Sequence, residues 1–140
     1  MKMFLLITLA LTVFCALAPA QPAAAASGTK KESPFACDRL ALAPAARARH
    51  FDVLGPMLVR RRLAVRELAD GYEFQFSSDP ETMQLVAEWV AGEHLCCPFF
   101  DFEMRVEREG GPFWLRLTGR PGTKQFIQAD AANWIRPVQP

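Results

Sequence analysis

The stretch EHLCCPFF, which begins at Glu93, gathers side chains that could hold a metal ion or take part in thiol chemistry. If this stretch ends a helix, Glu93 and His94 share a helical face with Cys97, because residues three and four positions apart are neighbours. Cys96 adds a second sulfur, and Cys37 could supply a third from earlier in the chain. Thiolate and imidazole ligands favour zinc, copper(I) or another thiophilic ion over magnesium or calcium. The sequence therefore predicts a candidate metal site of Cys37, Cys96 and Cys97, completed or supported by His94 or Glu93.

A disulfide is a competing interpretation of the same cysteines. Cys15 lies in the predicted signal peptide, so three of the four cysteines remain after cleavage. Three sulfurs allow at most one bridge within the chain, and the pairs 37–96, 37–97 and 96–97 all stay open. A bridge between the neighbours Cys96 and Cys97 would be strained, so Cys37 is the expected partner of any bridge. A disulfide from Cys37 to Cys96 or Cys97 would close a long loop and stabilise the fold by about 3–4 kcal/mol. Cysteines also pack as small buried hydrophobes, so the pair could serve the fold alone.

Thiol redox chemistry is the least favoured interpretation. Catalytic thiolates are activated at helix N-termini, whereas Cys96 and Cys97 are expected at a helix C-terminus, where the dipole opposes negative charge. Phe99 and Phe100 add apolar surroundings that disfavour a bare thiolate. A bound cation would offset both effects.

No other catalytic constellation is recognised. The chain has two histidines, and no serine–histidine–aspartate set, glycine-rich phosphate loop or paired carboxylates can be assembled. His50 is interpreted as a surface or packing residue. Trp114 falls on a polar strand face, where a loop is expected to cover half of it; an exposed tryptophan would instead mark a contact surface for a protein partner. No enzymatic activity is assigned.

The N-terminus predicts export. Lys2 precedes an apolar run of 15 residues, Met3 to Leu17, and Ala-x-Ala cleavage options follow at 18–20 and 24–26. This layout is typical of a Sec-type signal peptide, and the run is short for a membrane span. A periplasmic or secreted protein is expected, with no membrane attachment after cleavage. The predicted organisation is a signal peptide (1–26), a flexible lead-in (27–34), one domain (35–136) and a tail (137–140).

Charge gives no support for a nucleic-acid partner. The 16 lysines and arginines include Lys2, which leaves 15 basic side chains against 15 acidic ones in the mature chain. The one basic cluster, RRRLAVR from Arg60 to Arg66, is interpreted as a solvated helix end.

Hydrophobic periodicity predicts an α+β domain. Helices are expected over 44–62, with an interruption at Gly55-Pro56, from Asp79 to about Cys96, and over 122–135. Between them, alternating segments separated by Asp70-Gly71 and by Gly110-Gly111 predict two hairpins. The expected architecture is a two-layer helix–hairpin–helix–hairpin–helix domain with a four-stranded antiparallel sheet. The middle helix is expected to bury Met83, Val86, Ala87 and Val90, and Phe126, Ile127 and Trp134 are the expected apolar contacts of the last helix.

The segments CDRLAL, ELADGYEFQF, EHLCCPFFDFEMRVE and GGPFWLRLTG resemble a family of small bacterial proteins of uncharacterised function. The shared pattern is a glutamate three residues before a cysteine pair, followed by Pro-Phe, here Glu93, Cys96, Cys97 and 98–99. The resemblance extends from about Cys37 to residue 129. It implies that the three cysteines belong to one pattern, and it implies no catalytic residues. The members of that family look cytosolic, whereas this chain has a predicted signal peptide.

Overall fold

The fold is described by a computed structural model for residues 31–137, so the predicted signal peptide lies outside the described residues. The elements are short 3-10 helix η1 (Arg39–Ala41), α1 (Pro44–Ala48), π-helix η2 (Arg49–Leu54), α2 (Gly55–Arg61), β1 (Ala64–Glu67), β2 (Tyr72–Phe76), α3 (Pro80–Cys96), β3 (Phe100–Val106), β4 (Phe113–Gly119), α4 (Thr123–Asp130) and α5 (Ala132–Ile135). Within this part of the chain, no helix has the length and apolar character needed to cross a membrane.

The four strands form one antiparallel sheet in the order β1-β2-β4-β3. The predicted hairpins are therefore confirmed, and so is the α+β class. The sequence did not determine how the two hairpins join. In the structure β2 pairs with β4, with Phe74 opposite Leu115.

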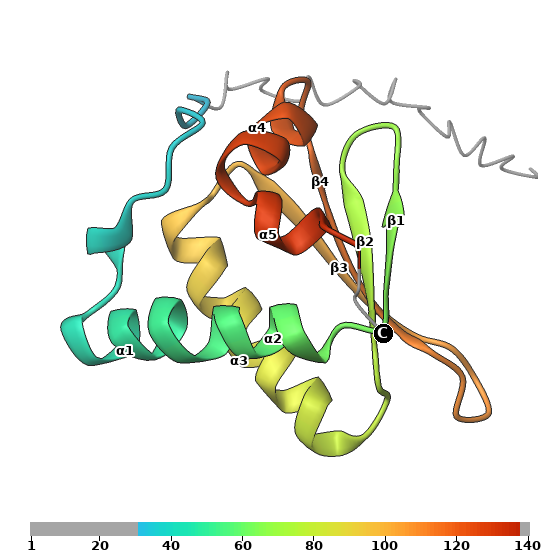
Figure 1. The fold of residues 1–140 in the computed structure, drawn as a ribbon. Coiled ribbons are helices and arrows are strands. Elements are labelled where there is room, and N and C mark those ends of the chain that lie inside the picture. Colours follow the sequence, from blue (N-terminus) through green and yellow to red (C-terminus); the bar gives the residue numbers. More distant parts are fainter. Residues whose placement is uncertain (1–30, 138–140) are drawn as a thin grey trace, which may run out of the picture. The chain divides into compact units, whose positions relative to one another are not determined.

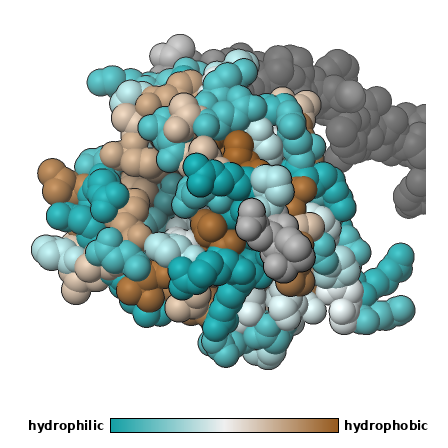
Figure 2. All heavy atoms as spheres, in the orientation of Figure 1, coloured by the Kyte–Doolittle hydropathy of each residue, from teal (hydrophilic) through white to brown (hydrophobic). Residues whose placement is uncertain are grey.

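The helices cover one face of this sheet (Figure 1). In that view α1, η2 and α2 form a nearly continuous rod that crosses α3, and α4 and α5 lie on the side of this rod where α3 ends. Apolar side chains from the strands meet those of the helices in a buried core that includes Phe74, Phe76, Phe113, Leu115, Leu54, Leu58, Val86 and Ile127. On the side of the molecule drawn in Figure 2, hydrophobic residues form small areas set among hydrophilic ones.

On the opposite face of the sheet, some side chains are more buried than the alternation of polar and apolar residues along the strands predicted. Glu73 is only 2% exposed because it lies between the guanidinium groups of Arg66 and Arg116, and forms an ion pair with each. Trp114 is buried under Arg66, whose Cζ lies 4.2 Å from the ring centroid. The expected covering loop is thus replaced by an arginine, in a cation–π contact.

The first helical region is interrupted earlier than predicted. The expected break at Gly55-Pro56 lies inside a continuous helical path, and the irregularity is the π-helix η2 just before it. Proline has no N–H to donate to the preceding turn. The wider turn accommodates this because the Gly55 N–H bonds to the His50 carbonyl, five residues back.

Helix α3 starts and ends as predicted. Asp79 accepts a hydrogen bond of 2.9 Å from the Thr82 N–H, and the helix stops at Cys96. Of the predicted buried face, Val86 is buried, Met83 and Val90 are half-buried against the core, and Ala87 is wrong, since it is exposed. The residues that are buried follow a different stripe, namely Thr82, Val86, Trp89, Glu93 and Cys96. This stripe carries the carboxylate of Glu93 inward.

The last helix is divided at Ala131 into α4 and α5, and Ile127 and Trp134 are buried as predicted. Arg62, from the basic cluster, donates hydrogen bonds of 2.8 and 2.6 Å to the carbonyls of Asn133 and Arg136. This arginine is buried rather than solvated, because it caps the carbonyls left free at the end of α5.

Candidate metal centre

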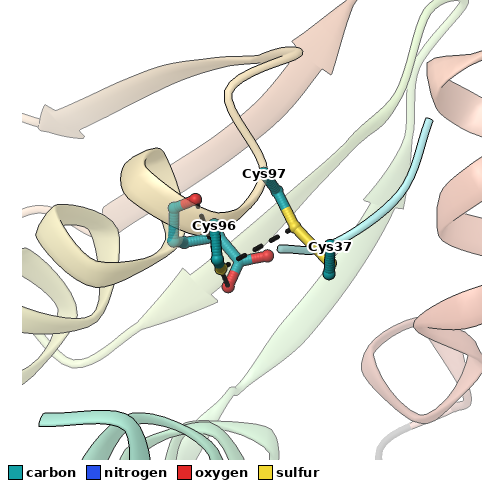
Figure 3. Close-up of side chains that lie close together, drawn as sticks. Cys37, Cys96 and Cys97 are labelled. Atoms are coloured by element: carbon teal, nitrogen blue, oxygen red, sulfur yellow. Dashed lines mark hydrogen bonds between the residues drawn. A yellow bond between two sulfur atoms is a disulfide. The ribbon is translucent and has the colours of Figure 1, made fainter. Parts of the chain in front are cut away.

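A disulfide joins Cys37 to Cys97, with the Cα atoms 4.9 Å apart across 60 residues of sequence (Figure 3). It ties the segment that precedes α1 to the end of α3. The same junction carries a backbone hydrogen bond of 2.8 Å from the Asp38 N–H to the Cys96 carbonyl. Of the three pairings left open by the sequence, the structure selects 37–97. Cys97 can turn toward Cys37 because it has left helical geometry, as expected for the residue before Pro98.

Cys96 is the one free cysteine of the described residues, and it is completely buried. Its Sγ lies 3.6 Å from Oε2 of Glu93 and 3.8 Å from Sγ of Cys97. Burial raises the pKa of this thiol to about 12, and the charge of Glu93 and the hydrogen bond to it act in the same direction. In the disulfide state Cys96 is therefore a neutral thiol, and its hydrogen has two acceptors at 3.6 Å, the carboxylate and the backbone carbonyl of Glu93.

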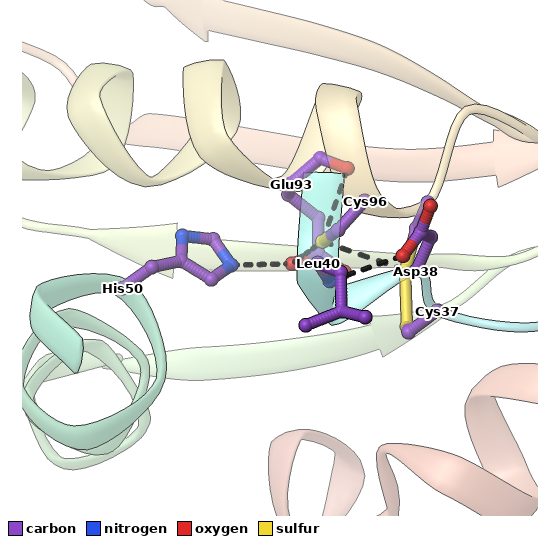
Figure 4. The surroundings of a disulfide bond; sticks show 7 residues. Cys37, Asp38, Leu40, His50, Glu93 and Cys96 are labelled. Atoms are coloured by element: carbon purple, nitrogen blue, oxygen red, sulfur yellow. Dashed lines mark hydrogen bonds and ion pairs between the residues drawn. A yellow bond between two sulfur atoms is a disulfide. The ribbon is translucent and has the colours of Figure 1, made fainter. Parts of the chain in front are cut away.

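Glu93 is held from the other side by His50, whose Nε2 lies 2.8 Å from Oε2 (Figure 4). A carboxylate only accepts hydrogen bonds, so Nε2 of His50 carries the hydrogen. The imidazole is stacked on Trp89, with 5.7 Å between centroids, and Phe51 meets it edge to face. Gly92 allows this approach, because a Cβ there would lie only 2.6 Å from Nδ1 of His50.

The structure brings together four of the five residues predicted for the metal site. One ligand atom from each of Cys37, Cys96, Cys97 and Glu93 lies within 4.8 Å of the others. His94 is outside this cluster: it is exposed and its ring packs beside Phe102, with 6.4 Å between centroids. The reason is helical geometry, since consecutive residues on α3 point about 100° apart and Glu93 takes the inward position.

His50 is the site residue that sequence reasoning did not find. A single histidine on a predicted helix carries no pattern that distinguishes a site residue from a surface residue. The π-helix η2 brings it to Glu93, and no sequence signal for a π-helix was recognised. Its place beside a buried carboxylate is a property of the tertiary structure, although π-turns do often occur at functional sites.

Comparisons with known proteins add no assignment. No family model matches this chain, and no significantly similar sequence among the curated proteins and no matching fold among the solved structures was found. The geometry of the residues around Cys96 therefore carries the functional argument.

Proposed function

We propose that this protein binds one soft metal ion when its disulfide is reduced, through Cys37, Cys96, Cys97 and Glu93. The observation that carries the proposal is the convergence of these four donor atoms within 4.8 Å. Three sulfurs and one carboxylate oxygen suit zinc or copper(I) better than hard cations.

Two distances in the cluster agree with tetrahedral coordination of zinc. With Zn–S near 2.3 Å and Zn–O near 2.1 Å, two sulfurs should lie about 3.8 Å apart, and a sulfur and an oxygen about 3.6 Å apart. The Sγ atoms of Cys96 and Cys97 are 3.8 Å apart, and Cys96 Sγ lies 3.6 Å from Glu93 Oε2. After reduction, the sulfurs of Cys37 and Cys97 must separate to van der Waals contact, which moves them toward the same spacing.

Charge supports a cation at this place. The raised pKa of Cys96 means that the protein alone does not stabilise a thiolate there, beside Glu93 and at the C-terminal end of α3. A metal ion supplies the missing positive charge and makes deprotonation favourable. His50 would then act from outside the ligand set by orienting the Glu93 carboxylate, as partners of metal ligands commonly do.

The disulfide and the full burial of Cys96 and Cys97 favour a second candidate function. In it the cysteines only stabilise the fold of a structural or protein-interaction module. The predicted leader would deliver the chain to the periplasm or the exterior, where disulfides persist. The two candidates differ in what the reduced protein does.

The deciding experiment uses the chain without residues 1–26, both with its disulfide intact and after reduction by a phosphine without oxygen. Zn²⁺ and Cu⁺ are added separately, stoichiometry is read by native mass spectrometry, and affinity is read by competition with a chromophoric chelator. We expect one ion per reduced chain, proton release on binding, and no ion in the oxidised chain.

Matched variants separate ligands from neighbours. Cys96→Ala should abolish stoichiometric binding, and His50→Ala should weaken it about 10- to 100-fold. His94→Ala is the control, since His94 adjoins Glu93 but lies outside the cluster. The metal site would be refuted if the reduced chain bound no ion, or if His94→Ala and Cys96→Ala lost metal affinity equally. The structural or protein-interaction module would then remain as the candidate function.

A further inference from the structure

A cavity of about 520 Å³ lies beside the His50–Glu93 pair. It is lined by residues from the segment around Cys37, from η2, from α3, and from α4 and α5. The volume falls within the range of small-molecule sites and exceeds what a single metal ion needs. The cavity therefore calls for an explanation that goes beyond the proposed metal function and does not depend on it.

The lining is mainly aromatic. Six of the rings that face the cavity come from separate parts of the chain: Phe35, Phe51, Phe74, Trp89, Phe126 and Trp134. Several rings pack against one another, as Trp89 and Trp134 do with 4.6 Å between centroids, which fixes the shape of the wall. Such a surface favours a flat, apolar ligand body, and its ring faces also attract cations.

Two lining rings already contact cations. The guanidinium of Arg39 lies 3.8 Å from the centroid of Phe51, and that of Arg120 lies 4.1 Å from the centroid of Phe35. In both contacts the protein's own guanidinium group covers one face of a lining ring, so the rings left for a ligand are those of Phe74, Trp89, Phe126 and Trp134. Arg39 itself is exposed and is one of the residues that line the cavity.

Two buried polar side chains line the cavity, His50 and Glu93, and Nδ1 of His50 has no hydrogen-bond partner among the described residues. Glu93 uses Oε2 for its hydrogen bonds with His50 and Cys96, and within residues 31–137 no donor reaches its Oε1. The side chain of Glu93 is 11% exposed, and the residue lines the cavity. A second carboxylate, that of the exposed Asp130, also lines the cavity. A ligand that donates hydrogen bonds and carries positive charge complements this arrangement.

We infer that the cavity binds a small organic amine with an apolar, aromatic body. The ammonium group donates to Oε1 of Glu93, and the apolar body lies among the rings of Trp89, Phe126 and Trp134. Because Cys37 belongs to one wall and is held by its bond to Cys97, the site is complete in the oxidised protein. It needs no metal ion.

The test uses the oxidised chain without residues 1–26, in the presence of a chelator. The probes are 2-phenylethylamine, 2-phenylethanol and 3-phenylpropionate, which share a body and differ in their polar end. Tryptophan fluorescence reports binding, because Trp89 and Trp134 line the cavity, and chemical-shift changes confirm the location. We expect saturable binding of the amine, affinity about tenfold lower for the alcohol, and no binding of the acid.

Three variants make the test specific. Glu93→Gln should lower the affinity for the amine about tenfold and leave the affinity for the alcohol unchanged. Ala131→Leu, which adds volume at a half-buried lining position, should lower the affinities for both the amine and the alcohol. Trp114→Phe should preserve the fluorescence response, since Trp114 lies on the other face of the sheet. Circular dichroism confirms that each variant is folded.

Failure of this inference is distinguishable from failure of the metal site. In the oxidised chain the sulfurs of Cys37 and Cys97 are bonded to each other, so the proposed metal site is incomplete and amine binding measured there in the presence of a chelator is independent of it. Absence of saturable amine binding at millimolar concentration, or equal binding of amine and acid, would overturn the inference whatever the reduced chain does with metal ions.

Discussion

The imidazole of His50 and the carboxylate of Glu93, 43 residues apart in the chain, share a buried hydrogen bond of 2.8 Å. This contact joins the π-helix η2 to α3 beside the sulfur atoms. It lies between the aromatic cavity and Cys96, so a single carboxylate takes part in both candidate sites. The fold must keep this carboxylate paired, because an unpaired buried charge is costly.

Replacing His50 by alanine should lower the free energy of unfolding by about 3 kcal/mol or more, since removal of one partner leaves the Glu93 charge buried. Urea unfolding of the oxidised chain at neutral pH measures this. Arg61→Ala is the control, because Arg61 pairs with Glu81 on the surface and should cost at most about 1 kcal/mol. Similar losses in both variants would contradict a critical role for the buried pair.

Replacing Gly92 by alanine should destabilise the protein by about 1–3 kcal/mol, because the new Cβ would lie 2.6 Å from Nδ1 of His50. The reason can be tested by a double-mutant cycle. In the His50→Ala background the imidazole is absent, so the same glycine change should cost much less. An undiminished cost in that background would show that His50 is not what Gly92 accommodates.

Peptide mapping without reductant should recover Cys37 linked to Cys97, with Cys96 as the free thiol. Cys37→Ala removes an exposed side chain, so its main effect is loss of the cross-link. We expect a loss of about 4 kcal/mol for a loop of 60 residues. The reduced parent chain should match this variant in urea unfolding. Recovery of a 37–96 bridge would contradict the structure directly.

The raised pKa of Cys96 predicts loss of stability at alkaline pH. The folded thiol keeps its proton up to about pH 12, whereas the unfolded thiol loses it near 9.0, its ordinary pKa. Between these values the folded state binds more protons, so stability falls as pH rises, by about 1.4 kcal/mol per unit. Below pH 9 this contribution is constant.

The measurement compares unfolding of the parent chain and Cys96→Ala from neutral pH upward. The difference between them should shrink or reverse only above pH 9, and alkylation of folded Cys96 by iodoacetamide should stay slow until the same range is passed. Rapid alkylation at pH 8 would show an accessible, activated thiol and would revive the redox interpretation.

Local patterns in the sequence were enough for the α+β class, the two hairpins and the two ends of α3. Asp79 and Pro80 specify the start of α3, Pro98 specifies its end, and the glycines at 71 and 110–111 lie in the hairpin turns. These signals act over a few residues, through backbone hydrogen bonds and allowed dihedral angles, so they can be read without knowledge of the fold. The proximity of Glu93 to the cysteine pair could also be predicted locally, because residues three and four positions apart on a helix are neighbours.

The tertiary structure decided which side of α3 is buried, and hence the composition of the site. Glu93 lies inward and His94 outward because a distant imidazole, from His50, compensates for burying the carboxylate. Likewise, three sulfurs allowed several bridges, and only the packing of the segment before α1 against the end of α3 brought Cys37 to Cys97. Such pairings depend on contacts between residues 43 and 60 positions apart, which no local pattern encodes.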